Sequence, residues 1–208
     1  MLFLQGFKQK NWAQIFIVCT RYLIGAAFVY ASVVKIQGGR FTAVDGIESP
    51  INSAWHFFET LYQSGLYWNF IGLGQLIAGL LLMTQRYAKL GAVINFPIVA
   101  NVFVITLSYD FNSTPVITGL MTLANLLLLL WDWDSLRVLF NLPQLEGKAD
   151  RLEKDKVWEL TGLALFSFTL IMQLIKMHHV LLWLVGCSLI GLVGLILGLK
   201  RTKYYKSV

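Results

Sequence analysis

The sequence predicts an all-α integral membrane protein with six membrane-spanning helices. The chain has 208 residues, of which 57% are hydrophobic and only 13% are charged, too few charges for an ordinary soluble domain. The charges are clustered, and the long stretches between them are almost uncharged. Runs such as NLLLLLW at 125–131 are continuous, whereas the strands of a membrane barrel alternate between apolar and polar residues.

Each predicted span is long enough for a helix to cross the bilayer. A span needs about 20 mostly apolar residues to cover about 30 Å of hydrocarbon, and a helix satisfies its own backbone hydrogen bonds there. The stretches that meet this requirement are 13–35, 67–84, 88–107, 115–131, 158–175 and 180–199.

The basic residues predict the orientation of the chain. Thirteen lysines and arginines fall on the side of the two termini, and only Lys35, Arg40 and Lys176 fall on the other. Because basic loops stay in the cytoplasm, both termini are expected there. The membrane is expected to be a cell membrane, of the bacterial inner-membrane type. An impermeant thiol reagent should then label cysteines near Ser49 and Asn112 from outside but not one near Ala149. The net charge of +6 reflects this topology, and no nucleic-acid partner is expected.

The first span, 13–35, carries its polar residues on one face. Arg21, Gly25, Phe28, Ser32 and Lys35 lie within about 80° on a helical wheel. A charge inside a span costs about 2.5–3.5 kcal/mol on insertion scales and usually faces the interior of a bundle. This face is therefore predicted to point inward.

The loop after the first span contains a predicted amphipathic helix at 51–63. Apolar residues recur there at helical spacing, and His56 and Glu59 lie on the opposite stripe. Pro50 and Gly65 suit the two ends of such a helix. We expect it to lie on the outer membrane surface as a lid over the first four spans.

The Arg21, Phe28 and Lys35 spacing resembles the first-helix pattern of the DoxX-like (DoxX/DoxD) membrane proteins. The outer helix and the segment GLGQLIAGLLLMTQR at 72–86 extend the likeness over residues 15–133. Many members of that family carry an acidic residue where this chain has Gln75. The resemblance implies a four-helix unit, and it links some members to quinone-coupled sulfur oxidation, others to oxidative-stress membrane complexes and distant ones to receptor assembly.

The remaining segments follow from composition. Residues 1–133 form the DoxX-like unit, and 134–157 form a charged cytoplasmic linker whose segment 135–142 suits the membrane interface. Residues 158–199 form a transmembrane hairpin, and 200–208 form a basic cytoplasmic tail.

A polar layer in the four-helix unit is the first candidate site. Arg21, Gln75, Asn95 and Asn125 place one polar group from each span at similar depth, and amide oxygens can accept from a guanidinium. The layer either fixes helix packing or binds an anionic or carbonyl-bearing ligand such as a quinone head group. Lys35 is expected at the outer end of the same seam, beneath the 51–63 helix.

Two further groups of residues are candidates. The histidines His56, His178 and His179 are predicted on the outer side with Glu59. Their spacing matches no metal motif, so they are interpreted as ordinary interfacial histidines and no metal is assigned. In the last span, Gly191, Gly194 and Gly198 share a face with Cys187. Such a stripe allows close helix packing, against the preceding span or against a second protomer or partner.

These features favour a non-catalytic accessory or assembly subunit of a membrane complex. The alternative is the membrane subunit of a quinone-linked oxidoreductase, similar to thiosulfate:quinone oxidoreductase, and a small-molecule carrier is third. The sequence shows no recognisable set of catalytic residues, and no cofactor is expected. The oxidoreductase alternative would bind a quinone. The expected partners are the lipid bilayer and either another membrane protein or a second copy of the chain.

Overall fold

The computed structural model describes residues 6–145, 151–176 and 179–206, with side chains up to residue 201. Within these ranges, every regular element is helical, and six helices are long and apolar enough to cross a membrane. They are α2 (Asn11–Ile36), α4 (Leu66–Met83), α5 (Ala88–Ser108), α6 (Thr114–Trp131), α8 (Lys156–Leu174) and α9 (Val180–Lys206). The prediction of an all-α chain with six such helices is confirmed.

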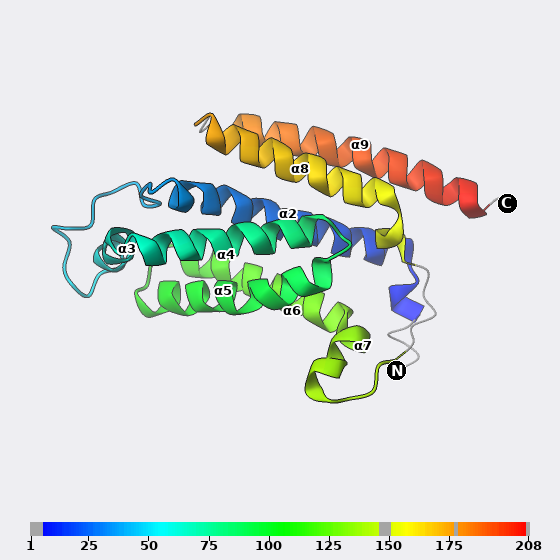
Figure 1. Ribbon diagram of the computed structural model, residues 1–208, viewed down its shortest axis with the longest axis horizontal. Coiled ribbons are helices and arrows are strands. Elements are labelled where there is room, and N and C mark those ends of the chain that lie inside the picture. The colour runs from blue at the N-terminus through cyan, green and yellow to red at the C-terminus, as the bar shows by residue number, and fades with distance from the viewer. Residues whose placement is uncertain (1–5, 146–150, 177–178, 207–208) are drawn as a thin grey trace.

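The six long helices run alternately in opposite directions, so the start of α2 and the end of α9 lie at the same end of the bundle (Figure 1). This end holds the start of α2, the turn after α4, the end of α6 and the start of α8, and we call it the charged end. The opposite end carries α3 (Ala54–Gln63) and is called the α3 end.

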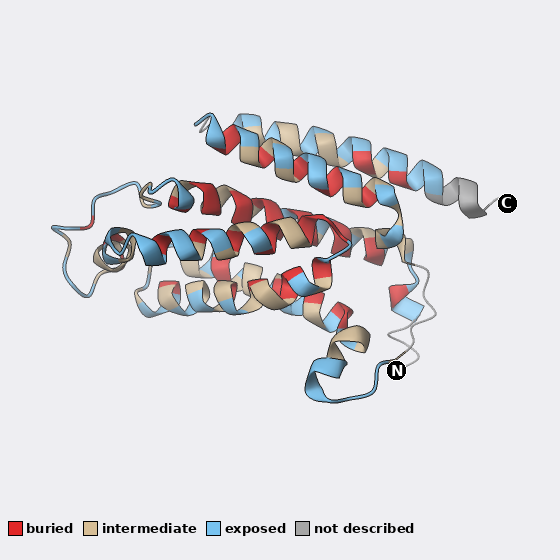
Figure 2. Ribbon diagram, viewed as in Figure 1, coloured by how far each residue is buried: buried red, intermediate tan, exposed pale blue. Residues whose placement is uncertain are grey.

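Helix α2 lies at the centre of the molecule and is buried on two sides (Figure 2). On one side, Ile17, Ile24 and Phe28 belong to an apolar core shared with α4, α5 and α6. On the other side, Val18 and Val29 belong to a second core shared with α4 and α8. All five residues of the polar face predicted for this span are buried, because the helix has neighbours in both directions.

Glycines set the distance between α2 and α4. A Cβ atom added at Gly79 would lie 2.8 Å from the carbonyl oxygen of Gly25, and one at Gly25 would lie 2.5 Å from the Cγ of Met83. Small residues allow the backbones of membrane helices to approach in this way.

Helix α8 packs against α2 and α4 as well as against α9, its partner in the predicted hairpin. A Cβ atom added at Gly162 would lie only 1.7 Å from the carbonyl oxygen of Met83. The hydroxyl of Tyr22 donates a hydrogen bond to the carbonyl oxygen of Trp158. Helix α9 is peripheral, because Gly194 and Gly198 are its only buried residues between Val180 and Arg201. The bundle core therefore contains five helices.

The α3 helix begins three residues later than the predicted range 51–63. The backbone N–H of His56 donates to the hydroxyl of Ser53, which is the usual action of an N-cap residue. The rings of Trp55 and Phe58 contact Phe111 in the turn between α5 and α6. The helix thus bridges toward that turn across the α3 end.

The connection from α6 to α8 contains three short helical elements. They are α7 (Trp133–Leu136), η1 (Arg137–Phe140) and η2 (Leu152–Lys154). Part of the predicted linker, including Lys148 and Ala149, lies outside the described residues. The predicted basic tail continues α9 as far as Lys206.

Candidate functional site: a buried ion-pair network at the charged end

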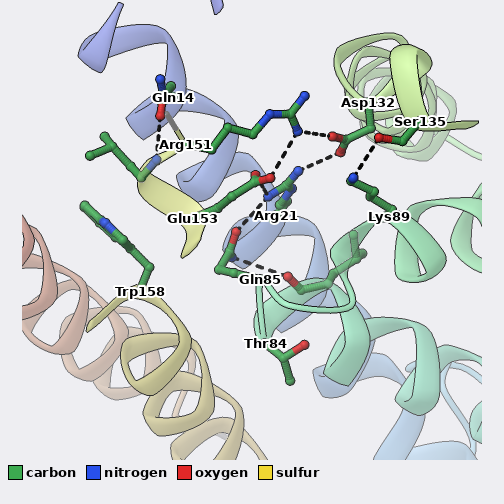
Figure 3. A network of polar contacts seen from close by, with 12 residues as sticks. Gln14, Arg21, Thr84, Gln85, Lys89, Asp132, Ser135, Arg151, Glu153 and Trp158 are labelled. Atoms are coloured by element: carbon green, nitrogen blue, oxygen red, sulfur yellow. Dashed lines mark hydrogen bonds and ion pairs between the residues drawn. The ribbon is translucent and has the colours of Figure 1, made fainter. Parts of the chain in front are cut away.

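Arg21 lies at the centre of a buried polar network that joins three parts of the chain (Figure 3). Its side chain is 1% exposed. One terminal nitrogen donates to Asp132, at 2.7 Å, directly after α6. The other terminal nitrogen donates to Glu153 in η2 and to Gln85 in the turn after α4, at 3.0 Å. A planar guanidinium suits this role because its donors point in fixed directions.

A second arginine completes the network. One terminal nitrogen of Arg151 donates to Asp132 at 2.5 Å and to Glu153 at 3.1 Å. Burial opposes the charge on Arg151, but the two carboxylates outweigh burial and raise its pKa above the ordinary value. Two cations and two anions therefore neutralise each other, as buried charges require.

The connector residues 151–154 are held on α2 as well as on each other. The backbone N–H of Leu152 donates to the side-chain oxygen of Gln14 at 2.7 Å. Gln14 in turn donates to the carbonyl oxygen of Lys8 at 2.8 Å. This part of the predicted cytoplasmic linker is therefore docked against the first helix.

Gln85 is positioned by a tight turn. Its φ is 57°, a region that non-glycine residues rarely adopt, and the side chain is buried. Its amide oxygen accepts from Arg21 while its nitrogen donates to the carbonyl oxygen of Leu82 at 3.4 Å. The turn after α4 is thereby fixed to the first helix.

The predicted polar layer does not form around Arg21. Asn95 donates to the amide oxygen of Asn125 at 3.0 Å, and Asn125 donates to the carbonyl oxygen of Ala92 at 3.0 Å. Gln75 is buried elsewhere, and its side-chain oxygen has no hydrogen-bond partner among the described residues. Arg21 pairs instead with carboxylates and Gln85 at the helix ends, because ionised acceptors bind a guanidinium more strongly than amides do.

The α3 end has its own pair of charged side chains. Arg40 donates to both carboxylate oxygens of Glu59, at 2.7 and 2.8 Å. These hydrogen bonds are the main cause that lowers the pKa of Glu59, and Gly46 and Gln63 add to the effect. Glu59, predicted on a polar outer stripe, is therefore buried by its partner.

Lys35 is buried at the same end, but a loop residue covers it rather than α3. Its ammonium donates to the carbonyl oxygen of Ala31 at 2.9 Å. It lies 4.2 Å from the ring centroid of Phe41 and 5.0 Å from that of Trp68. Aromatic faces attract such a cation, so these rings supply the stabilisation that a carboxylate would otherwise give.

The remaining candidates are distributed as follows. The described residues hold no group of three potential metal ligands, and His178 lies outside them. Cβ atoms added at Gly194 and Gly198 would meet Thr161 and Trp158 of α8. Gly191 has nothing within 4 Å at that position.

The network can hold helix ends together, and a narrow recess lies beside it. The recess beside it is lined by Gln14, Val18, Trp131, Arg151 and Glu153 and is too narrow for a water molecule. Arg21 joins α2, the α4–α5 turn, the end of α6 and the connector at one point. We call this arrangement the clamp, because its charged side chains hold these segments together.

The sequence of this chain is similar to that of another protein. The chain is 41% identical over 109 residues to the uncharacterized protein YwoB of Bacillus subtilis (strain 168), and the alignment covers 50% of this chain and 67% of YwoB. The chain belongs to the same family as YwoB. No family model and no solved structure matches it.

Proposed function

We propose that this chain is a multi-pass membrane protein that serves as a non-catalytic accessory or assembly subunit of a membrane complex, with both termini in the cytoplasm. The observation that carries the proposal is the self-contained network of Arg21, Asp132, Arg151 and Glu153. Catalytic groups must be aimed at a reacting atom, whereas these groups are aimed at each other. They make a rigid body of the kind an assembly subunit needs.

The resemblance of the first span to the DoxX-like proteins supports the same role. Some members of that family work within membrane complexes. The buried Arg21, Phe28 and Lys35 lie on the face that carries the resemblance. The proposal extends the resemblance to a DoxX-like four-helix arrangement of α2, α4, α5 and α6.

Helix α9 offers the surface for a partner span. Gly194 and Gly198 are occupied by α8, but Gly191 on the same helix is open. An open glycine lets a second helix approach closely. We therefore place the partner contact at Gly191.

The experiment is purification of the tagged full-length chain in mild detergent, followed by mass spectrometry. A membrane protein in stoichiometric amount is expected with the wild type, and Gly191→Leu should reduce its recovery at least about tenfold, because a lost helix contact of about 1.4 kcal/mol gives that factor. Leu123→Ala, on the exposed face of α6, is the control and should retain the partner. Purification of the chain alone would overturn the accessory role, and an unchanged Gly191→Leu complex would overturn the contact at α9.

A quinone-linked oxidoreductase subunit is the second candidate, and two buried oxygens favour it. The side-chain oxygens of Gln75 and Asn95 lack hydrogen-bond partners among the described residues. A hydroquinone hydroxyl can donate to such an amide oxygen. Lipid extraction from the purified protein tests this candidate: near one-to-one quinone in the wild type and none in Asn95→Leu would favour it, and quinone-free wild type would remove it.

A further inference from the structure

The short segment at 133–142 leaves the bundle sideways at the charged end, and we call it the foot. It consists of α7, η1 and the two residues that follow, and Figure 1 shows it turned aside from the axis of α6. Asn141 adopts a left-handed backbone conformation that ends η1, and the N–H of Leu145 bonds back to the carbonyl oxygen of Asp134 at 3.3 Å. The foot is thus an ordered turn.

The foot exposes large apolar side chains outside the six spans. Leu139 is 68% exposed, Phe140 63%, Val138 50% and Leu142 42%. The ring of Phe140 lies 5.3 Å from that of Trp133. A contiguous apolar patch rimmed by polar residues marks a membrane or protein contact, and aromatic residues concentrate where lipid headgroups begin.

The foot holds one acidic and one basic residue, and two lysines from other parts of the chain contact it. Its acidic residue Asp134 is neutralised by Lys8 at 2.6 Å. The ammonium of Lys89 reaches the foot through the hydroxyl of Ser135 at 2.8 Å. Arg137 has no carboxylate partner among the described residues, and its Nε atom is buried without a hydrogen bond.

We propose that the foot is a binding site for an anionic phospholipid. Arg137 and Lys89 bind the phosphate of the headgroup, while Leu139 and Phe140 enter the boundary between headgroups and acyl chains. A lipid fits better than a protein partner, because the foot continues directly from the apolar helix α6 at the level of the bundle end. Basic residues at a membrane surface attract anionic lipids, and amphipathic segments bind by the same combination of charge and apolar area.

The test uses the full-length chain in lipid nanodiscs, where both ends of the bundle are accessible to reagents. An NBD fluorophore is attached to Leu139→Cys after Cys19 and Cys187 are replaced by serine, and Glu48→Cys in the exposed α3-end loop carries the control label. Iodide should quench the label at 139 at least about threefold less than the label at 48, because an inserted label is shielded from water.

Lipid selectivity is measured with headgroup spin-labelled phosphatidylglycerol and phosphatidylcholine at equal mole fraction. The label at 139 should be quenched at least about fivefold more effectively by phosphatidylglycerol, since each basic residue near the surface contributes about that factor. Arg137→Gln should lower the ratio about fivefold, to what Lys89 alone supports. Arg201→Gln removes the same charge at the same end from an exposed pair with Asp155 and should leave the ratio unchanged.

Each outcome decides the proposal. A label at 139 as open to iodide as the label at 48 would show that the foot does not enter the membrane. A protected label with equal quenching by the two lipids would show insertion without an anionic site. Both decisive results come from labelled chains that retain Arg137, so the proposal is tested even if Arg137→Gln fails to fold.

Discussion

Removing one member of the buried network should destabilise the chain far more than removing two of opposite sign. Arg21→Met deletes one positive charge and leaves Asp132 and Glu153 facing Arg151 alone. Asp132→Asn deletes one negative charge and leaves two arginines facing Glu153. The double variant restores neutrality and retains the Arg151–Glu153 pair at 3.1 Å.

The magnitude follows from burial. The side chains of Arg21 and Asp132 are each 1% exposed, so solvent screens neither charge. Breaking a buried pair by removing one partner costs about 3–5 kcal/mol, whereas replacing both partners is often close to neutral. The double variant should therefore be less destabilised than either single variant, so its loss should fall short of the sum of the two single losses by at least about 3 kcal/mol, the upper end of the range known for contacting residues.

The assay is unfolding of the full-length chain in mixed micelles by titrated sodium dodecyl sulfate, followed by tryptophan fluorescence. Arg201→Met is the matched control, because it removes a positive charge from the same end but from a pair with Asp155 whose side chains are 48% and 23% exposed. More exposed pairs contribute about 0–1 kcal/mol. Arg21→Met within about 1 kcal/mol of the wild type, or strict additivity in the double variant, would refute the clamp.

Two further predictions concern packing and pH. Gly162→Val should destabilise the chain by about 1–3 kcal/mol or more, because even its Cβ would meet the carbonyl oxygen of Met83, whereas Gly191→Val should unfold at the wild-type concentration of detergent. Glu59 has a pKa below its ordinary value of 4.5 because Arg40 donates to its carboxylate, so the stability from this pair is complete above pH 4.5 and is lost as the pH falls below it. The protection factors of the α3 amides against hydrogen exchange should fall over that acidic range in the wild type, and wild-type protection as independent of pH as that of Glu59→Gln would contradict the assignment.

The spans were predictable because a bilayer imposes one strict requirement on them. An apolar stretch of sufficient length must be helical to satisfy its backbone, so the boundaries of α2 and α4 follow from hydrophobicity alone. The N-cap of α3 was also within reach of the sequence, since Ser53 precedes the apolar pattern and Ser is a preferred cap. Local chemistry determines these elements.

The partners of Arg21 were not predictable from depth along the helices. Asn95 and Asn125 were chosen because they lie at similar depth, but Asn95 donates to Asn125 rather than accepting from Arg21. Asp132 and Glu153 reach Arg21 only because the connector folds back onto α2, and that fold depends on distant contacts. The usable signal was charge: an arginine within a span requires a buried anion, and Asp132 stands at the end of a neighbouring span on the same side.

The docking of α8 was missed for a related reason. Sequence reasoning emphasised the glycine pair Gly194 and Gly198, a recognised packing pattern. The single Gly162 lets α8 approach the end of α4, where an added Cβ would lie 1.7 Å from the carbonyl oxygen of Met83. One glycine in an apolar helix carries no pattern, so only the placement of Met83 opposite it shows its importance.

The separation of Arg21 from its partners along the chain has a consequence for biogenesis. Asp132 follows Arg21 by 111 residues, and at about 5–20 residues per second the ribosome needs about 6–22 s to make it. During this interval the first helix carries a positive charge into the membrane before either of its carboxylates has been synthesised. We expect the insertion machinery or a membrane chaperone to shield Arg21 until then. A photo-crosslinker at position 20 should capture such a factor from nascent chains that end near residue 120 and release it from chains that extend past residue 160, and equal capture at both lengths would argue against this order of events.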